Sequence, residues 1–188
     1  RSGRTVTSSS KHTIQAATDG LFEHVVNEVA EDFPDVVHQE ELFDSLLAKI
    51  IMSPEKYSII LVLNEYGDFL SDMACGLAGS MGIGASANLA FNRHGDVQLA
   101  MFDPAGGTAP DIAGKDICNP TAMLLAFAML LFELGQRELG QTVKSSVLHT
   151  LRVGERTRDL GGELSTTRFS EAVAGEISRR LAETVATE

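Results

Sequence analysis

The sequence has only two cysteines, few basic residues and no long apolar run, and each shortage excludes a class of protein. Cys75 and Cys118 form no Cys-x-x-Cys pair, which favours reduced thiols over a disulfide framework or a zinc cluster. The chain has 15 Lys and Arg residues and 26 Asp and Glu residues, and the resulting net charge of −11 argues against nucleic acid or an anionic membrane surface as the main partner. The longest apolar block, residues 122–132, is too short to cross a bilayer, and residues 1–11 lack the pattern of a signal peptide. These features predict a cytoplasmic protein, or a mitochondrial-matrix protein if a transit peptide precedes the chain.

What is present is the pattern of a soluble α/β protein. A chain of 188 residues with 44% hydrophobic and 22% charged residues can bury a core, either as one large domain or as two lobes. Short β-branched and aliphatic runs predict strands at 5–7, 36–37, 57–63 and 97–102. Apolar residues at helical spacing predict helices at 19–33, 40–52, 122–132 and 137–153, and a last helix carrying Phe169, Val173, Ile177 and Leu181. The continuous apolar composition of 122–132 predicts a helix that is covered on all sides.

The segment 64–72, Asn-Glu-Tyr-Gly-Asp-Phe-Leu-Ser-Asp, is a candidate metal site. It follows the strand predicted at 57–63, and ligand sites favour strand ends. If a helix begins near Tyr66, Asp68 and Asp72 lie one turn apart on one face, where two carboxylates repel each other unless a cation lies between them. Oxygen ligands without His or Cys favour Mg²⁺ or Mn²⁺ over zinc. The alternative interpretation is a solvated helix face with two unrelated acids.

A second candidate site is the glycine- and proline-rich segment 103–115, which follows the strand predicted at 97–102. A loop of this length between ordered elements is usually functional. The sequence predicts Asn119 as the N-cap of the next helix, Pro120 in its first turn and Gly135 at its end. The glycine-rich run 76–88 is not a GxGxxG fingerprint, so alone it is weak evidence for a phosphate site.

Four segments follow one another in the order NEYGDFLSD, LAGSMGIGASANL, GGTAPDIAGKDICNPTAMLL and TRDLGGELSTTRF. Together with VTSSSKHTI and DGLFEHVVNEVAEDFPDV upstream, they resemble the β-decarboxylating dehydrogenases, namely isocitrate, 3-isopropylmalate and homoisocitrate dehydrogenases. The resemblance covers nearly the whole chain but only about the second half of such an enzyme. It implies the three-layer α/β fold of this family. Residues 1–77 would be part of the small, dimer-forming lobe, and residues 78–188 the C-terminal part of the large lobe.

The resemblance also implies roles for individual residues. Lys11 would be the catalytic base on the substrate's C2 hydroxyl, and Mg²⁺ or Mn²⁺ would bind to three carboxylates: Asp44, Asp68 and Asp72. Lys11 and Asp44 would be donated by the partner subunit of a homodimer. The segment from Gly107 to Asn119 would bind the adenosine half of NAD, with Asn119 on the adenine edge and Asp111 on the ribose hydroxyls, where its charge would repel the 2′-phosphate of NADP. Seven residues would contact NAD. These are Asn88, Gly107, Thr108, Ala109, Asp111, Ile112 and Asn119.

The sequence departs from the family's pattern at four positions, and two hypotheses follow. Gly106 stands where family members usually carry His, Thr13 where they carry Asn, Glu65 where they carry an apolar residue, and Phe69 where they carry a smaller aliphatic one. The first hypothesis is half of an NAD- and metal-dependent oxidative decarboxylase of a 2-hydroxy acid, whose substrate-binding arginines and catalytic tyrosine come from a complementing N-terminal half. The second is a non-catalytic subunit or binding protein with the same fold.

Overall fold

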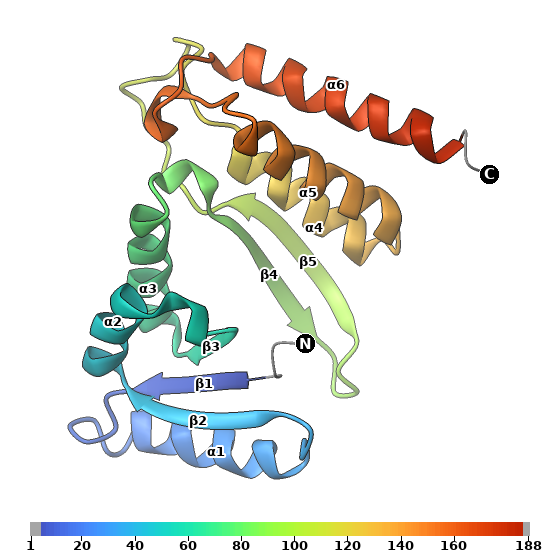
Figure 1. Cartoon of the computed structure of the whole chain (residues 1–188). Helices are drawn as coiled ribbons and strands as arrows, with labels where there is room; N and C mark the ends of the chain where they lie inside the picture. Colours follow the sequence, from blue (N-terminus) through green and yellow to red (C-terminus); the bar gives the residue numbers. More distant parts are fainter. Residues whose placement is uncertain (1–4, 186–188) are drawn as a thin grey trace. The chain divides into compact units, whose positions relative to one another are not determined.

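The chain divides into two compact units, Arg1–Leu77 and Ala78–Glu188. The computed structural model describes residues 5–185, and its mixture of helices and strands confirms the predicted α/β class (Figure 1). Within residues 5–185, every helix is too short or too polar to span a bilayer.

The first unit is built on a three-stranded parallel sheet with the order β2-β1-β3. Each strand leads to a helix, as parallel strands require for their connections. The core of this unit surrounds the buried residues Phe43, Leu46 and Leu70. The elements in chain order are β1 (Thr5–Ser10), α1 (Asp19–Glu31), β2 (Val37–Leu42), α2 (Phe43–Met52), the 3-10 turn η1 (Pro54–Lys56), β3 (Ile59–Val62) and α3 (Asn64–Leu77).

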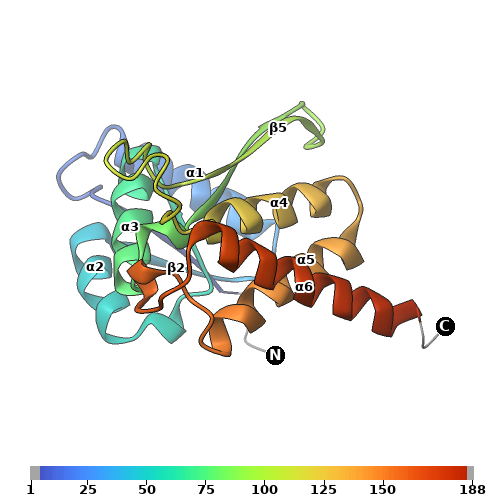
Figure 2. The ribbon, with the colours of Figure 1, turned by 90° about the horizontal axis from the view of Figure 1, so that it is seen from above.

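The second unit combines an antiparallel hairpin with three helices. Helix α4 contacts both strands of the hairpin, and α5 contacts both α4 and α6. Figure 2 shows the three helices from above. The core between the helices includes Val147, Phe169 and Val173, each 0–1% exposed. The elements are η2 (Met81–Ile83), β4 (Ala85–Phe91), β5 (Val97–Pro104), α4 (Thr121–Glu133), α5 (Arg137–Arg152), η3 (Arg158–Leu160) and α6 (Thr166–Val185).

Three expectations from the sequence are wrong, each for a physical reason. The helix expected from residue 40 begins at Phe43, because residues 40–42 pair with β1 as the end of β2. The N-cap of α4 is Pro120 rather than Asn119, because the backbone of Pro120, with a ψ of 3°, lies outside the helical range and the helix begins at Thr121. Helix α4 is not covered on all sides: Met123 and Phe127 are 54% and 47% exposed, since β4, β5 and α5 cover only part of its surface.

Candidate functional site

The carboxyl ends of the three parallel strands meet at one edge of the first sheet. In the register of the sheet, Ser10 of β1 lies beside Leu42 of β2, and Ser9 lies beside Val62 of β3. Lys11 follows β1 directly, α2 follows β2, and α3 follows β3 after one residue. The segments that carry the predicted catalytic lysine and metal ligands therefore all leave the sheet at the same edge, where parallel sheets place their ligand sites.

Lys11 and Asp44 form an ion pair at this edge. The Nζ atom of Lys11 lies 2.7 Å from Oδ1 of Asp44, which stands in the first turn of α2. The hydrogen bond from Lys11, strengthened by its charge, lowers the pKa of the Asp44 carboxyl below its usual value. The Asp44 side chain is 66% exposed, so it keeps free surface for a further partner. The structure thus brings together the predicted base and one predicted metal ligand.

The backbone around Lys11 is fixed by a buried carboxylate, Asp19. Asp19 is 2% exposed, and its Oδ2 accepts hydrogen bonds from the backbone N–H of Lys11 at 2.8 Å and from the Tyr66 hydroxyl at 2.7 Å. Burial acts to raise the pKa of Asp19, but these bonds and one from Thr18 outweigh it, so the pKa lies below its ordinary value. The hydrogen bond to Asp19 raises the pKa of Tyr66 to about 12. Asp19 thereby connects the loop of Lys11 to the start of α3.

Asp68 and Asp72 both lie on α3 and are exposed. Within residues 5–185, no lysine, arginine or histidine forms an ion pair with either carboxylate. Asp44 does not join them within the described part of a single chain, because the three ligand atoms do not approach within 4.8 Å of one another. The two α3 carboxylates are uncompensated oxygen donors one helical turn apart, a donor set that fits Mg²⁺ or Mn²⁺.

The segment predicted to bind the adenosine half of NAD connects β5 to α4 in the second unit. Gly107, Thr108, Ala109 and Asp111 are exposed, and Ile112 is half-buried. Ala109 has a positive φ of 39°, a conformation that residues other than glycine adopt mainly at turns and functional sites. Asn88, the remaining predicted contact outside this segment, is exposed on β4.

The far end of this segment is anchored to α6. The Asp116 carboxylate accepts hydrogen bonds from the backbone N–H of Thr167 at 2.9 Å and from its hydroxyl at 2.8 Å. The Thr166 hydroxyl donates to the backbone carbonyl of Cys118 at 2.6 Å. Asp116 also has a positive φ of 56°, so the chain turns sharply where it is anchored. The exposed residues of the segment are therefore held between two fixed points, β5 and the start of α6.

Asn119 is buried and both ends of its side chain have partners. Its Oδ1 accepts a hydrogen bond at 3.0 Å from the backbone N–H of Thr121, the first residue of α4, although the N-cap position itself is occupied by Pro120. Its Nδ2 donates to Oδ2 of Asp159 at 2.8 Å, and Asp159 accepts a second hydrogen bond from the Ser80 hydroxyl. Burial acts to raise the pKa of Asp159, but the bonds from Ser80 and Asn119 outweigh it and hold the pKa below its usual value. A Cβ on Gly82 would lie 2.9 Å from the Cβ of Asn119, so this close approach requires glycine.

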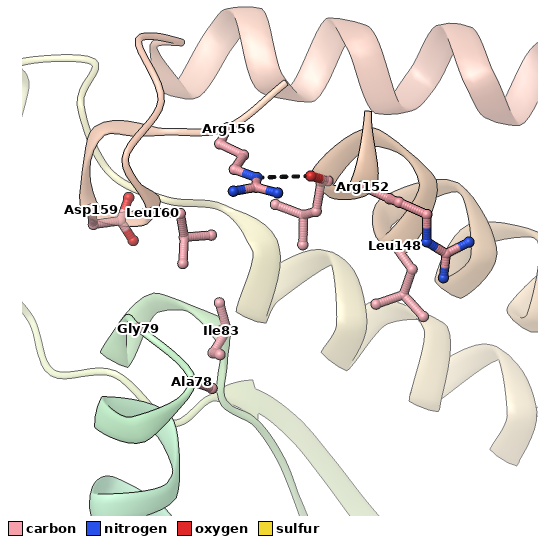
Figure 3. Close-up of a pocket in the computed structure, with 9 residues that line it drawn as sticks. Ala78, Gly79, Ile83, Leu148, Arg152, Arg156, Asp159 and Leu160 are labelled. Atoms are coloured by element: carbon pink, nitrogen blue, oxygen red, sulfur yellow. Dashed lines mark hydrogen bonds between the residues drawn. The ribbon is translucent and has the colours of Figure 1, made fainter. Parts of the chain in front are cut away.

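A cavity of about 510 Å³ lies beside this network in the second unit (Figure 3). Asp159 and two arginines, Arg152 and Arg156, contribute its charged groups, and Nε of Arg156 donates to the backbone carbonyl of Leu151 at 2.8 Å. The remaining lining residues are small or apolar: Ala78, Gly79, Ile83, Leu148, Leu151 and Leu160.

Four residues of these networks were not assigned roles from the sequence: Asp19, Tyr66, Ser80 and Asp159. All four lie inside segments that carry the family resemblance, so position in a motif was the only signal for them. Their partners lie far away in the sequence, and only the folded chain shows the pairing. Gly135, expected to end α4, has a φ of 75° and does so.

The chain is similar over most of its length to one family of known proteins. A model of the family described as "Isocitrate/isopropylmalate dehydrogenase" matches residues 1–173. An isocitrate/homoisocitrate dehydrogenase of Thermus thermophilus is 43% identical over 173 residues, which are 92% of this chain and 50% of that protein. A 3-isopropylmalate dehydrogenase of Archaeoglobus fulgidus is 39% identical over 175 residues, which are 93% of this chain and 52% of that protein.

Solved structures show the same relationship. The isocitrate dehydrogenase from Methylococcus capsulatus superimposes with a TM-score of 0.86 at 32% identity, over 93% of this chain and 50% of that one. A β-decarboxylating dehydrogenase from Thermococcus kodakarensis gives a TM-score of 0.80 at 35% identity, over 95% of this chain and 50% of that one. The 188 residues thus span about half the length of the relatives they match.

Proposed function

The chain belongs to the isocitrate/isopropylmalate dehydrogenase family, and from this premise we propose that it carries the catalytic lysine and the metal ligands of an NAD-dependent oxidative decarboxylase. The proposed substrate is a 2-hydroxy acid of the isocitrate or 3-isopropylmalate type. Because the chain spans about half of its relatives, we propose that a second polypeptide segment supplies the rest of the substrate site.

The ion pair between Lys11 and Asp44 is the observation that carries this proposal. Lys11 leaves the sheet at the end of β1 and Asp44 follows β2, yet Nζ and Oδ1 are 2.7 Å apart. A base and a metal ligand that act on the same hydroxy acid must lie within a few ångströms of each other, which is what this pair provides. Asp19 and Tyr66 hold the Lys11 backbone in place, so the arrangement does not depend on a single surface contact.

Asp68 and Asp72, together with Asp44, would hold Mg²⁺ or Mn²⁺. Since Asp44 does not reach Asp68 and Asp72 within the described part of one chain, we propose that it reaches the ion from a second copy. When bound, the cation would supply Lewis acidity to the oxygens of the hydroxy acid, and NAD⁺ would accept the hydride. In its neutral amine form, Lys11 would accept the proton of the C2 hydroxyl at Nζ, an atom that Asp44 positions.

For the cofactor, we propose that residues 107–112 contact the adenosine half of NAD. Asp111 is exposed, without an ion pair among the described residues, and its charge would favour ribose hydroxyls over a 2′-phosphate. The role we propose for Asn119 differs from the expected direct contact between its side chain and the adenine ring. Both ends of that side chain are hydrogen-bonded, to Asp159 and to the backbone of Thr121, so Asn119 would shape the adenine site by connecting Asp159 to the first residue of α4.

A non-catalytic subunit is the second hypothesis, and the buried network around Lys11 argues against it. A buried carboxylate is costly unless it is hydrogen-bonded, and Asp19 uses its bonds to tie the loop of Lys11 to Tyr66 on α3. The hydrogen bonds of Asp19 position Lys11, whose side chain is 31% exposed and therefore accessible to a substrate. A subunit without catalytic turnover would not need a lysine positioned in this way. We therefore favour the catalytic hypothesis.

The test uses a fusion in which the unmatched half of the Thermus thermophilus relative precedes residues 1–188; this protein is called the fusion below. NADH formation from isocitrate, homoisocitrate and 3-isopropylmalate is followed with Mn²⁺. Lys11→Met should lower kcat by roughly 10²–10⁴-fold, the usual contribution of a general base, while leaving Mn²⁺ affinity unchanged. Lys49→Met is the matched control, because Lys49 is an exposed lysine paired with Glu41 and should be neutral.

Two results would contradict the proposal. The first is full activity in the Lys11→Met fusion. The second is a fusion that binds Mn²⁺ and NAD but forms no NADH from any of the three acids, which would support the non-catalytic hypothesis instead.

A further inference from the structure

A second group of metal-ligating side chains, which includes none of the proposed catalytic carboxylates, lies in the first unit. His12 follows β1, Glu23 lies on α1 and Glu40 lies on β2. One ligand atom from each lies within 4.8 Å of the other two. In the part of the chain that the structure describes, no other group of three His, Cys, Asp or Glu residues meets this criterion.

Glu23 gives an independent indication that this group faces a ligand. The residue is only 4% exposed, and its Oε2 accepts a hydrogen bond from the Ser8 hydroxyl at 2.6 Å. Its Oε1 is buried and has no hydrogen-bond partner. A buried carboxylate oxygen without a partner is destabilising, and such groups in folded proteins usually face an ion or an ordered molecule.

Neighbouring hydrogen bonds fix the orientation of Glu23. Because the Ser8 hydroxyl has one hydrogen and donates it to Glu23, Nε2 of His38, 2.9 Å from the same oxygen, must act as the donor to Ser8. The chain His38–Ser8–Glu23 therefore holds Oε2 and leaves Oε1 for another ligand. Support of this kind, in which a second residue orients the ligating group, is a regular feature of metal sites.

The charges of the group are not balanced within the chain. Glu40 has one ion-pair partner in residues 5–185, Nδ1 of His12 at 3.3 Å, and Glu23 has none. The nearest lysine in sequence, Lys11, is engaged with Asp44. Two carboxylates and one imidazole thus share a space without a lysine or arginine, and a divalent cation would neutralise both acids.

We propose that His12, Glu23 and Glu40 bind a divalent transition-metal ion, with Zn²⁺ as the best match. Imidazole nitrogen favours zinc and related ions, whereas Mg²⁺ and Ca²⁺ prefer oxygen ligands alone. Tetrahedral zinc with ligands at about 2.1 Å sets its ligand atoms about 3.4 Å apart, so the side chains need to close by no more than about 1.4 Å from 4.8 Å. His12 is partly exposed and Glu40 is exposed, so both can rotate inward.

This site is distinct from the proposed magnesium or manganese site and does not rest on the proposed function. It would join the loop after β1, the helix α1 and the strand β2. His12 is the residue after Lys11, so the bound ion would also fix the peptide that carries the lysine.

The probes are Zn²⁺, titrated by calorimetry, and Co²⁺, whose visible absorption reports nitrogen and carboxylate ligands, both added to the 188-residue chain in millimolar Mg²⁺. We expect one ion per chain at micromolar concentration. His12→Ala and Glu40→Gln should each weaken binding tenfold or more and change the Co²⁺ spectrum. Both residues are at least partly exposed, so these variants should fold.

Two controls separate this site from others. His24→Ala removes an exposed histidine that is paired with Glu28 at 3.4 Å, and Asp68→Asn with Asp72→Asn removes the α3 carboxylates; neither should change zinc affinity. The proposal is overturned if the chain binds no Zn²⁺ at 100 μM, or if His12→Ala and Glu40→Gln bind it as tightly as the unmodified chain.

Discussion

Replacing Asp19 with Asn would remove a buried charge with almost no change in side-chain size. The carboxylate accepts three hydrogen bonds, from the backbone N–H of Lys11 at 2.8 Å, the Tyr66 hydroxyl at 2.7 Å and the Thr18 hydroxyl at 3.1 Å. The first two converge on Oδ2. An asparagine keeps one acceptor oxygen, so these two bonds can persist only as neutral ones.

The expected loss of stability follows from those two bonds. A hydrogen bond to a charged group contributes about 1.5–3 kcal/mol and a neutral one about 0.5–1.5 kcal/mol, so each loses about 1–1.5 kcal/mol. The lower cost of burying a neutral amide offsets part of this sum. We expect Asp19→Asn to lower the free energy of unfolding of the first unit by about 2 kcal/mol at pH 7.

The effect should depend on pH in a defined direction. The pKa of Asp19 in the folded chain lies below the ordinary value of 3.8, because its hydrogen bonds outweigh its burial. The stabilisation is therefore fully present above pH 3.8 and is lost as the pH falls through the lower folded-state pKa. The difference in free energy of unfolding between the unmodified chain and Asp19→Asn should therefore become smaller only in that acidic range.

Tyrosine fluorescence during urea unfolding measures this directly. The chain has two tyrosines and no tryptophan, and both Tyr57 and Tyr66 lie in the first unit, so the signal reports that unit alone. Glu28→Gln, an exposed acid on the same helix, is the matched control and should stay within about 0.5 kcal/mol. An Asp19→Asn variant as stable as this control at pH 7 would show that the charge of Asp19 does not stabilise the first unit.

Three further predictions concern association, folding and cofactor choice. Phe69→Lys, at a 59% exposed position on α3, should shift the chain toward the monomer in light scattering, whereas Val153→Lys, at a 56% exposed position, should not. An unchanged mass for Phe69→Lys would contradict the expectation that α3 lies in the dimer surface. Gly162→Ala should destabilise the second unit by at least about 2 kcal/mol in calorimetric unfolding, because the alanine Cβ would lie 2.0 Å from the backbone oxygen of Arg156. A loss of stability below about 0.5 kcal/mol would contradict this close contact. In the fusion, Asp111→Lys should shift the ratio of kcat/KM toward NADP, and an unchanged ratio would show that Asp111 does not select the cofactor.

Regular local patterns made much of the fold predictable. Helix α6 carries Phe169 and Val173 one turn apart, and both are buried as their spacing indicated. Strand β2 was harder, because residues 38–41 are His-Gln-Glu-Glu, which show no apolar alternation. They form a strand because they pair in register with β1, and that pairing is a tertiary contact that local preference does not encode.

In the candidate site, too, the features that depend on local sequence could be predicted and those that depend on tertiary contacts could not. Asp68 and Asp72 could be proposed from helical spacing alone, since the chemistry of two carboxylates one turn apart is local. The contacts of Asp19 with Tyr66 and of Asn119 with Asp159 join residues 47 and 40 positions apart, and no local pattern predicts them. The zinc-binding group proposed above likewise exists only because β1, α1 and β2 are packed together.

In the proposed dimer, Lys11 of one copy and Asp68 of another form a single catalytic centre. Two inactive fusions, Lys11→Met and Asp68→Asn, are unfolded, mixed and refolded together, and mixed dimers are verified by mass. Random pairing makes half of the dimers mixed, and each mixed dimer has one site with both residues intact, so NADH formation should recover to about a quarter of the unmodified rate. No recovery in verified mixed dimers would mean that each copy uses its own Lys11 and Asp68, which contradicts a catalytic centre shared between copies.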